Sequence, residues 1–223
     1  MIKAITCIKR KPGMSVDDFQ AYWRTEHAEV VKGLPNLRRY IQSHALLGGY
    51  RKGELPYDGI AEIWVDDVDT LRAMAGGAAY AAVQRDEENF IDRPNMAMIL
   101  TQEHIIKDGP IPDGAVKNIE FVPRKSGMDV EAFQAYWRDV HGPIAAEIEV
   151  IRRYVQSHTL AGGYRDGRVP AWDGCAITWF DSVADMRKSA ESEAYDRTRK
   201  DEPNFLDTGE EIPFIITTEH VII

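Results

Sequence analysis

The chain contains the same sequence twice. Residues 11–44 align without gaps onto residues 125–158, and about half of these positions are identical. Downstream, DEENFID corresponds to DEPNFLD, and TQEHII corresponds to TTEHVI. A duplication of this length describes a whole structural unit, so it constrains the fold more than any single motif does. Segment 107–115, KDGPIPDGA, is rich in turn-forming residues and is the expected linker between two domains, residues 1–110 and 111–223.

Each repeat shows the same order of hydrophobic periodicities. In the first repeat we predict strands at 2–9, at 37–47, from residue 58 onward, and at 96–106. A helix capped by Ser15, with Asp18 at the third helical position, follows the first strand. A second helix starts at Asp66 or Asp67 and is predicted to continue through Ala78. The order is βαββαβ, so the sequence predicts an α+β fold of two ferredoxin-like repeats. One such repeat leaves one face of its sheet bare, and the second copy can cover it.

The composition argues against two classes of partner. The 223-residue chain has a formal net charge of −9, and its basic residues are scattered along the sequence. Nucleic acids and anionic membranes are bound through basic patches, so neither is an expected partner.

The N-terminal segment lacks the apolar core of a signal peptide, and no apolar run has the length of a membrane helix. The two cysteines lack the spacing of a metal or redox pair, and we expect a cytoplasmic protein.

The stretch FQAYWRTEHAEVVKGLPNLRRYIQSH, followed by YDGIAEIW and DEENFID, resembles the EthD family of dimeric α/β-barrel proteins. The resemblance covers nearly the whole chain, once in each half. It implies that the halves pack sheet to sheet as a fused homodimer, with a pocket in each half between sheet and helices. The wider superfamily includes cofactor-free oxygenases, lactone isomerases, polyketide cyclases and decarboxylases, and haem enzymes, so the fold alone does not select an activity. The chain is expected to be either a monomer with an internal pseudo-dimer or a further homodimer.

One histidine lies on the apolar face of the predicted first helix. Phe19, Trp23 and His27 follow each other at intervals of four residues and share one face, and His141 has the same position in the second repeat. A buried imidazole titrates near neutrality and can act as an acid or a base. The alternative is a core histidine that is hydrogen-bonded to a neighbour. Because the resemblance implies a pocket below this helix, we hypothesise that His27 shuttles a proton and that Trp23 and His141 contact substrate.

The repeats differ at one charged position on the strand that begins at residue 58. Glu62 lies there between large apolar residues, whereas the second repeat has Ile177. A carboxylate in such a place is costly unless it is paired or protonated. One interpretation is an ion pair with Arg38 or Arg72. The other is that Glu62 faces His27 across the cavity and orients its imidazole, which would make the first half the equipped one.

Other side chains are candidates for binding substrate. Tyr40 and His44 share one face of the strand at 37–47, and Arg39 lies on the opposite face. Tyr40 and Arg39 could hold phenolate or carboxylate oxygens, while His44 belongs either to a substrate site or to a polar network. Tyr50 lies on a glycine-bounded loop that could cover a planar ligand, although an exposed loop position explains it as well.

The leading functional hypothesis combines these residues with the resemblance. It is a cofactor-independent lyase (a decarboxylase, dehydratase or cyclase) acting on an aromatic or polyketide-like acid, with His27, Glu62 and Tyr40 as catalytic residues. The sequence lacks a glycine-rich phosphate loop, a dinucleotide fingerprint and HExxH ligand spacing, and we expect neither a metal nor another cofactor. The alternatives are a non-catalytic accessory protein that binds a small hydrophobic ligand, and a cofactor-free oxygenase or isomerase of the same superfamily.

Overall fold

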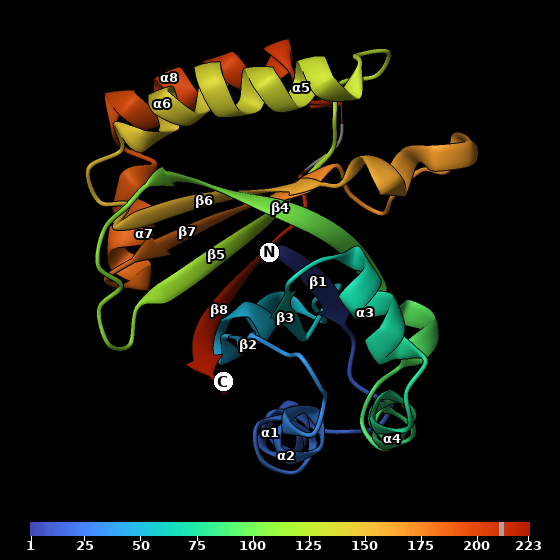
Figure 1. Cartoon of the computed structure of the whole chain (residues 1–223). Helices are drawn as coiled ribbons and strands as arrows, with labels where there is room; N and C mark the ends of the chain where they lie inside the picture. The colour runs from blue at the N-terminus through green and yellow to red at the C-terminus, as the bar shows by residue number, and fades with distance from the viewer. Residues whose placement is uncertain (210–211) are drawn as a thin grey trace. The chain divides into compact units, whose positions relative to one another are not determined.

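The computed structural model describes residues 1–209 and 212–223, which form two compact units (Figure 1). The first unit contains residues 1–100 and 217–223, and the second contains residues 101–216. These limits differ from the repeat boundary near residue 110, because the last strand of each repeat pairs with a strand of the other repeat. The division at residue 110 describes the sequence repeat and stays a prediction.

The first unit is an antiparallel sheet with helices packed on one face. Its elements are β1 (Ile2–Ile8), α1 (Val16–Tyr22), η1 (Trp23–His27), α2 (Ala28–Lys32), β2 (Arg39–Ala45), η2 (Leu47–Lys52), β3 (Gly59–Val65), α3 (Val68–Ala75), α4 (Ala78–Glu87) and η3 (Arg93–Asn95). The strand order is β1-β3-β2, and residues 217–221 of β8 (Phe214–Val221) pair with β2 as the fourth strand. The helices cover the sheet through an apolar core of Val31, Leu34, Tyr40, Val65, Met74 and Val83.

The second unit repeats this arrangement. Its elements are residues 101–107 of β4 (Ala97–Lys107), β5 (Val116–Val122), α5 (Val130–Tyr136), η4 (Trp137–His141), α6 (Gly142–Ala146), β6 (Arg153–Thr159), η5 (Ala161–Gly167), β7 (Gly174–Phe180), α7 (Val183–Ser189), α8 (Glu193–Asp201) and η6 (Glu202–Asn204). The strand order is β5-β7-β6, and β4, from the end of the first repeat, pairs with β6. The prediction of an α+β fold built from two ferredoxin-like βαββαβ repeats is confirmed.

The predicted helix starts are confirmed, and one predicted helix is divided. The hydroxyl of Ser15 accepts a hydrogen bond from the backbone N–H of Asp18 at 3.1 Å, and Asp67 caps α3 by accepting from the N–H of Thr70 at 2.7 Å. The second helix was expected to continue through Ala78. It ends instead at Ala75, and α4 starts at Ala78 after two glycines, which have low helix propensity.

A glycine in β3 positions the first helix over the sheet. A Cβ atom at Gly59 would lie 2.3 Å from Cζ3 of Trp23, so the indole ring can pack there only against a residue without a side chain. Trp137 has the same relation to Gly174 in the second unit, at 2.6 Å. Each tryptophan thereby fixes the helical turn that carries His27 or His141.

Candidate active site

The predicted inward position of His27 is confirmed, but its partner is a different carboxylate from the one expected. A single π-helical turn, η1, joins α1 to α2, and Trp23 and His27 at its ends are 0% and 4% exposed. His27 Nδ1 lies 2.7 Å from Oδ2 of Asp86 in α4, and its ring contacts Phe90. Burial lowers the pKa of His27, and Asp86 opposes this shift. The role of His27 as a proton shuttle stays a prediction.

Glu62 does not face His27. Its carboxylate forms a buried ion pair with Lys3, with Nζ and Oε2 at 3.1 Å, and accepts a hydrogen bond from Ser43 at 3.2 Å. Its strand neighbours Ala61 and Ile63 pack against the helices, so Glu62 lies on the opposite face of the sheet. The alternative partners are also excluded, since Arg38 binds Asp66 and Arg72 binds Asp69, while Glu62 itself binds Lys3.

Tyr40 and His44 belong to a buried polar network. The hydroxyl of Tyr40 accepts hydrogen bonds from Trp23 Nε1 at 3.0 Å and from Gln42 Nε2 at 2.9 Å. His44 stacks on Trp23, its Nε2 lies 3.0 Å from Oε1 of Gln42, and its ring meets the edge of His220. Burial raises the pKa of Tyr40, and burial together with His220 lowers that of His44 to about 3. The geometry therefore favours the polar-network interpretation of His44.

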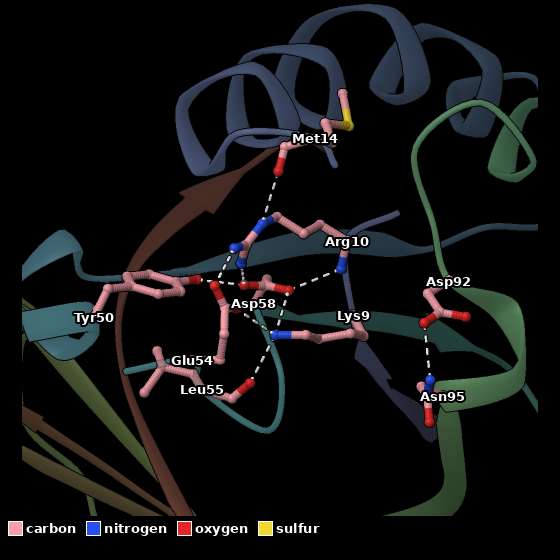
Figure 2. Close-up of polar contacts among 9 residues, drawn as sticks. All are labelled: Lys9, Arg10, Met14, Tyr50, Glu54, Leu55, Asp58, Asp92 and Asn95. Carbon is pink, nitrogen blue, oxygen red and sulfur yellow. Dashed lines mark hydrogen bonds and ion pairs between the residues drawn. The ribbon is translucent and has the colours of Figure 1, made fainter. Parts of the chain in front are cut away.

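Tyr50 is held by a carboxylate. Figure 2 shows its hydroxyl donating to Oδ1 of Asp58 at 2.6 Å, while Lys9 and Arg10 pair with the same carboxylate. Burial and the Asp58 carboxylate raise the pKa of Tyr50. This loop is thus fastened to the start of β3. Arg39 is exposed, and its guanidinium lies over the ring of Trp64 at 5.0 Å.

A cavity of about 660 Å³ lies in the second unit between its sheet and its helices. Strands β5, β6 and β7 form one wall, and η4, α6, α7 and α8 form the other. Aromatic side chains make up much of the lining, among them Trp137, Phe180, Tyr195 and Phe205. The polar groups that border the cavity include Asn118, Glu120, His141, Tyr154, Arg199 and Glu202. The expectation of a pocket between sheet and helices is thus confirmed for the second repeat.

Glu120 reaches this cavity from β5. Burial raises its pKa, which favours the protonated acid, and Asn118 Nδ2 lies 3.0 Å from its Oε1. Asn118 Oδ1 is buried without a hydrogen-bond partner among the described residues. An amide can donate to a carboxylate through its nitrogen or accept from a carboxylic acid through its oxygen. Asn118 can therefore serve Glu120 in both protonation states.

Glu202 enters the same cavity from the end of α8. Its side chain is 8% exposed, and its Oε1 lies 2.8 Å from Nη1 of Arg199, whose side chain is 47% exposed. Burial raises the pKa of Glu202 to about 7, although Arg199 opposes the shift, and the nearby Glu120 adds to it. A carboxyl group with this pKa can give or take a proton at neutral pH.

His141 completes the set of proton-transfer groups. Its Nδ1 lies 2.9 Å from Oδ2 of Asp201, its ring contacts Phe205, and burial lowers its pKa. A carboxylate at Nδ1 stabilises the tautomer that carries its proton on this nitrogen. Nε2 of the neutral ring is then free of a proton and can accept one. His141, predicted only to contact substrate, thus borders the cavity with two carboxyl groups.

The two units differ in the residues between sheet and helices. The second unit has Asn118, Glu120, Thr178, Ser189 and Thr198 where the first has, in the same order, Ala4, Thr6, Ile63, Met74 and Val83. In the first unit, Met74 and Val83 belong to the apolar core. Val31 of the first unit stands where the second unit has the smaller Ala145. The sequence analysis missed Glu120, Glu202 and Arg199. Comparison of the first strands of the two repeats would have indicated Glu120, because Asn118 and Glu120 there replace Ala4 and Thr6.

No group of three or more histidine, cysteine, aspartate or glutamate side chains in residues 1–209 and 212–223 is arranged to hold a metal ion. In the same part of the chain, no helix has the length and apolar character needed to span a bilayer.

Comparison with known proteins identifies one family. Residues 11–94 and 125–209 each match the EthD domain. A protein described as anthrone oxidase-like superposes with a TM-score of 0.64, at 10% identity, over 99% of this chain and 93% of its own. A Fusobacterium nucleatum protein named "Putative monooxygenase" gives 0.60 at 8% identity over 98% and 93%. A mutant chlorite dismutase from Candidatus Nitrospira defluvii gives 0.53 at 9% identity over 97% and 91%. These identities show a shared fold alone. No curated protein matches the sequence.

Proposed function

The chain belongs to the EthD family, as a tandem duplication of the dimeric α/β-barrel fold. We propose that it is a lyase that works by acid–base catalysis and that its active site is the cavity of the second unit. The reaction we assign is a decarboxylation, dehydration or cyclisation of an aromatic or polyketide-like acid. One observation carries this proposal. Two carboxyl groups, of Glu120 and Glu202, and the imidazole of His141 border a single cavity.

The cavity suits an aromatic ligand in size and lining. A volume of about 660 Å³ falls within the range of about 300–1,000 Å³ that is usual for small-molecule sites. Trp137, Phe180, Tyr195 and Phe205 offer flat apolar surfaces to a ring system. Arg199, which lines the cavity and has a partly exposed side chain, supplies a positive charge for an acid.

The three titratable groups can divide the proton transfers between them. In a decarboxylation, an acid delivers a proton to the carbon atom that loses carbon dioxide. In a dehydration or a cyclising condensation, a base removes one proton and an acid protonates the departing oxygen. Glu202 and Glu120, whose pKa values are raised, suit the acid role, and His141 Nε2 suits the base role. All of these steps use side chains alone, so the scheme requires no cofactor.

The first unit has a structural role in this proposal. Its counterpart of Glu202 is Glu87, which lies 3.7 Å from Arg93, and its counterparts of Glu120 and Arg199 are Thr6 and Gln84. His27 therefore keeps its aspartate but has only Glu87 for a second acid. The catalytic role expected for His27, Glu62 and Tyr40 passes in this proposal to His141, Glu202 and Glu120.

The test is turnover of hydroxybenzoic, hydroxynaphthoic and polyketide-type acids, followed by mass spectrometry of the products. Glu202→Gln and Glu120→Gln should each lower kcat at least about a hundredfold, the lower limit for loss of a general acid or base. Glu87→Gln, at the matching position of the first unit, is the control and should leave kcat unchanged. If both cavity variants keep full turnover, the acid–base assignment is wrong. If no acid of the series reacts but some bind, the non-catalytic accessory protein takes its place.

A further inference from the structure

The cavity of the second unit holds two carboxyl groups, and one of them is bound to an arginine. Arg199 and Glu202 are three residues apart at the end of α8, and their charged atoms are 2.8 Å apart. Glu120 has Asn118 as its hydrogen-bond partner and forms no ion pair among the described residues. Glu202 is therefore bound to the guanidinium of Arg199, the cationic group that an acidic ligand would need.

The cavity that holds Glu202 is lined by charged and titratable groups from every neighbouring element. They are Arg199 and Tyr195 on α8, Glu120 on β5, Tyr154 on β6, His141 on η4 and Arg187 on α7, while Asp201 directly precedes Glu202 in the chain. Glu120 and Asp201 both oppose ionisation of Glu202, whereas Arg199 favours it. The ionised form of Glu202 thus depends on its contact with Arg199, because burial and both neighbouring carboxyl groups act against it.

An acidic ligand would change this balance. A carboxylate that enters the cavity is repelled by an ionised Glu202 and attracted by the bidentate guanidinium of Arg199. If the ligand takes the guanidinium, Glu202 loses its cation while it gains a further negative neighbour. A buried carboxyl group in that situation is stable only in its neutral form.

We propose that a substrate carboxylate replaces the Glu202 carboxylate on Arg199, and that Glu202 then takes up one proton from solvent. The proposal rests on the function assigned above, because it specifies the substrate as a carboxylate and explains how the general acid is loaded. Ligands without a negative charge leave the Arg199–Glu202 pair intact and bind without a proton. The cavity thus recognises its substrate and protonates its own acid in the same step.

The proton uptake follows from the ordinary titration of Glu202. With a pKa of about 7 in the free protein, the group is about 90% ionised at pH 8, so binding takes up about 0.9 proton there and about 0.1 at pH 6. The dissociation constant of a carboxylate ligand should accordingly rise about tenfold per pH unit above pH 8. That of a neutral analogue should not change.

The experiment is titration calorimetry of the full chain with 2-naphthoate and with its neutral counterpart 2-naphthamide. Heats measured at pH 8 in Tris and in HEPES, which differ in ionisation enthalpy, give the number of protons taken up. We expect naphthoate to bind at least tenfold more tightly than naphthamide and to take up about one proton, while naphthamide takes up none. The wild-type pH dependence provides a second measurement that needs no variant.

Three variants separate the parts of the proposal. Glu202→Gln should bind naphthoate without proton uptake, Arg199→Gln should lose the preference for naphthoate, and Glu87→Gln should behave as the wild type. Melting temperatures show that each variant is folded. Equal affinity for the two ligands, no binding of either, or unchanged proton uptake in Glu202→Gln would overturn the proposal. The proposed function is tested separately. If naphthoate binds without proton uptake but Glu202→Gln still lowers turnover, the proton-uptake proposal is wrong and the lyase assignment stands. If binding is coupled to proton uptake but no acid is turned over, the lyase assignment is wrong and the chain is a binding protein.

Discussion

Replacing Glu62 by glutamine should destabilise the first unit rather than stop catalysis. Lys3 Nζ and Glu62 Oε2 are 3.1 Å apart, and the two side chains are 1% and 2% exposed. Glutamine keeps the size of glutamate and can still accept the hydrogen bond of Ser43, but it removes the negative charge. Loss of one partner from a fully buried ion pair typically costs about 3–5 kcal/mol. We expect a loss of that size in the free energy of unfolding of the first unit.

Urea denaturation followed by tryptophan fluorescence measures this loss, and the same protein samples can be assayed for turnover. The double variant Lys3→Met with Glu62→Leu removes both charges and should recover most of the stability, because an apolar pair of similar volume replaces the ion pair. Glu54→Gln removes an exposed partner of Lys9 and Arg10 and serves as the control for losing one carboxylate. A Glu62→Gln protein with wild-type stability and a hundredfold lower turnover would refute this reasoning and restore the catalytic role predicted from the sequence.

Gly174→Ala should destabilise the second unit by about 1–3 kcal/mol, the usual cost of overpacking, because the new methyl group would lie 2.6 Å from Trp137. Gly162→Ala has open space and is the control in the same denaturation assay, where equal midpoints would contradict the prediction. His158→Gln should reduce the loss of stability in acid. The pKa of His158 falls from 6.5 to about 3 through burial, so the unfolded chain binds the proton first and stability falls as the pH drops through this window, by about 2–3 kcal/mol at pH 4.5. Denaturation at pH 7 and pH 4.5 measures the difference, and an identical acid loss in both proteins would argue against it. Residues 1–110 produced alone should self-associate, because the residues of β8 that pair with β2 are missing. A stable monomer in sedimentation would show that the strand is dispensable.

The features of the fold that depend on repeats and on hydrophobic periodicity could be predicted from the sequence. The duplication, the order of strands and helices, the cap at Ser15 and the inward face of Trp23 and His27 all depend on residues close together in the chain. Such features follow from local rules of capping and periodicity. The fold class followed from them.

The partners of buried charges could not be predicted in the same way. His27 meets Asp86, which lies 59 residues away in DEENFID, a segment to which the sequence analysis assigned no chemistry. Glu62 was assigned correctly to a strand, but the face that it occupies depends on which side of the sheet the helices cover. The pocket was expected, but its polar lining was not, because the informative differences at Asn118 and Glu120 lie on the first strand of the repeat and not on the strand that carries Glu62.

The exchange of strands between repeats has a consequence for biosynthesis. Residues 217–221, which complete the first sheet beside β2, are synthesised well after β3, which ends at Val65 (Figure 1). At about 5–20 residues per second, roughly 8–30 s separate the synthesis of β3 from that of β8. Throughout this interval the nascent first unit presents β2 as an unpaired edge, which is open to pairing with other nascent chains. The yield of folded protein in a cell then depends on how the edge is shielded before the last strand arrives, and not only on the stability of the finished molecule.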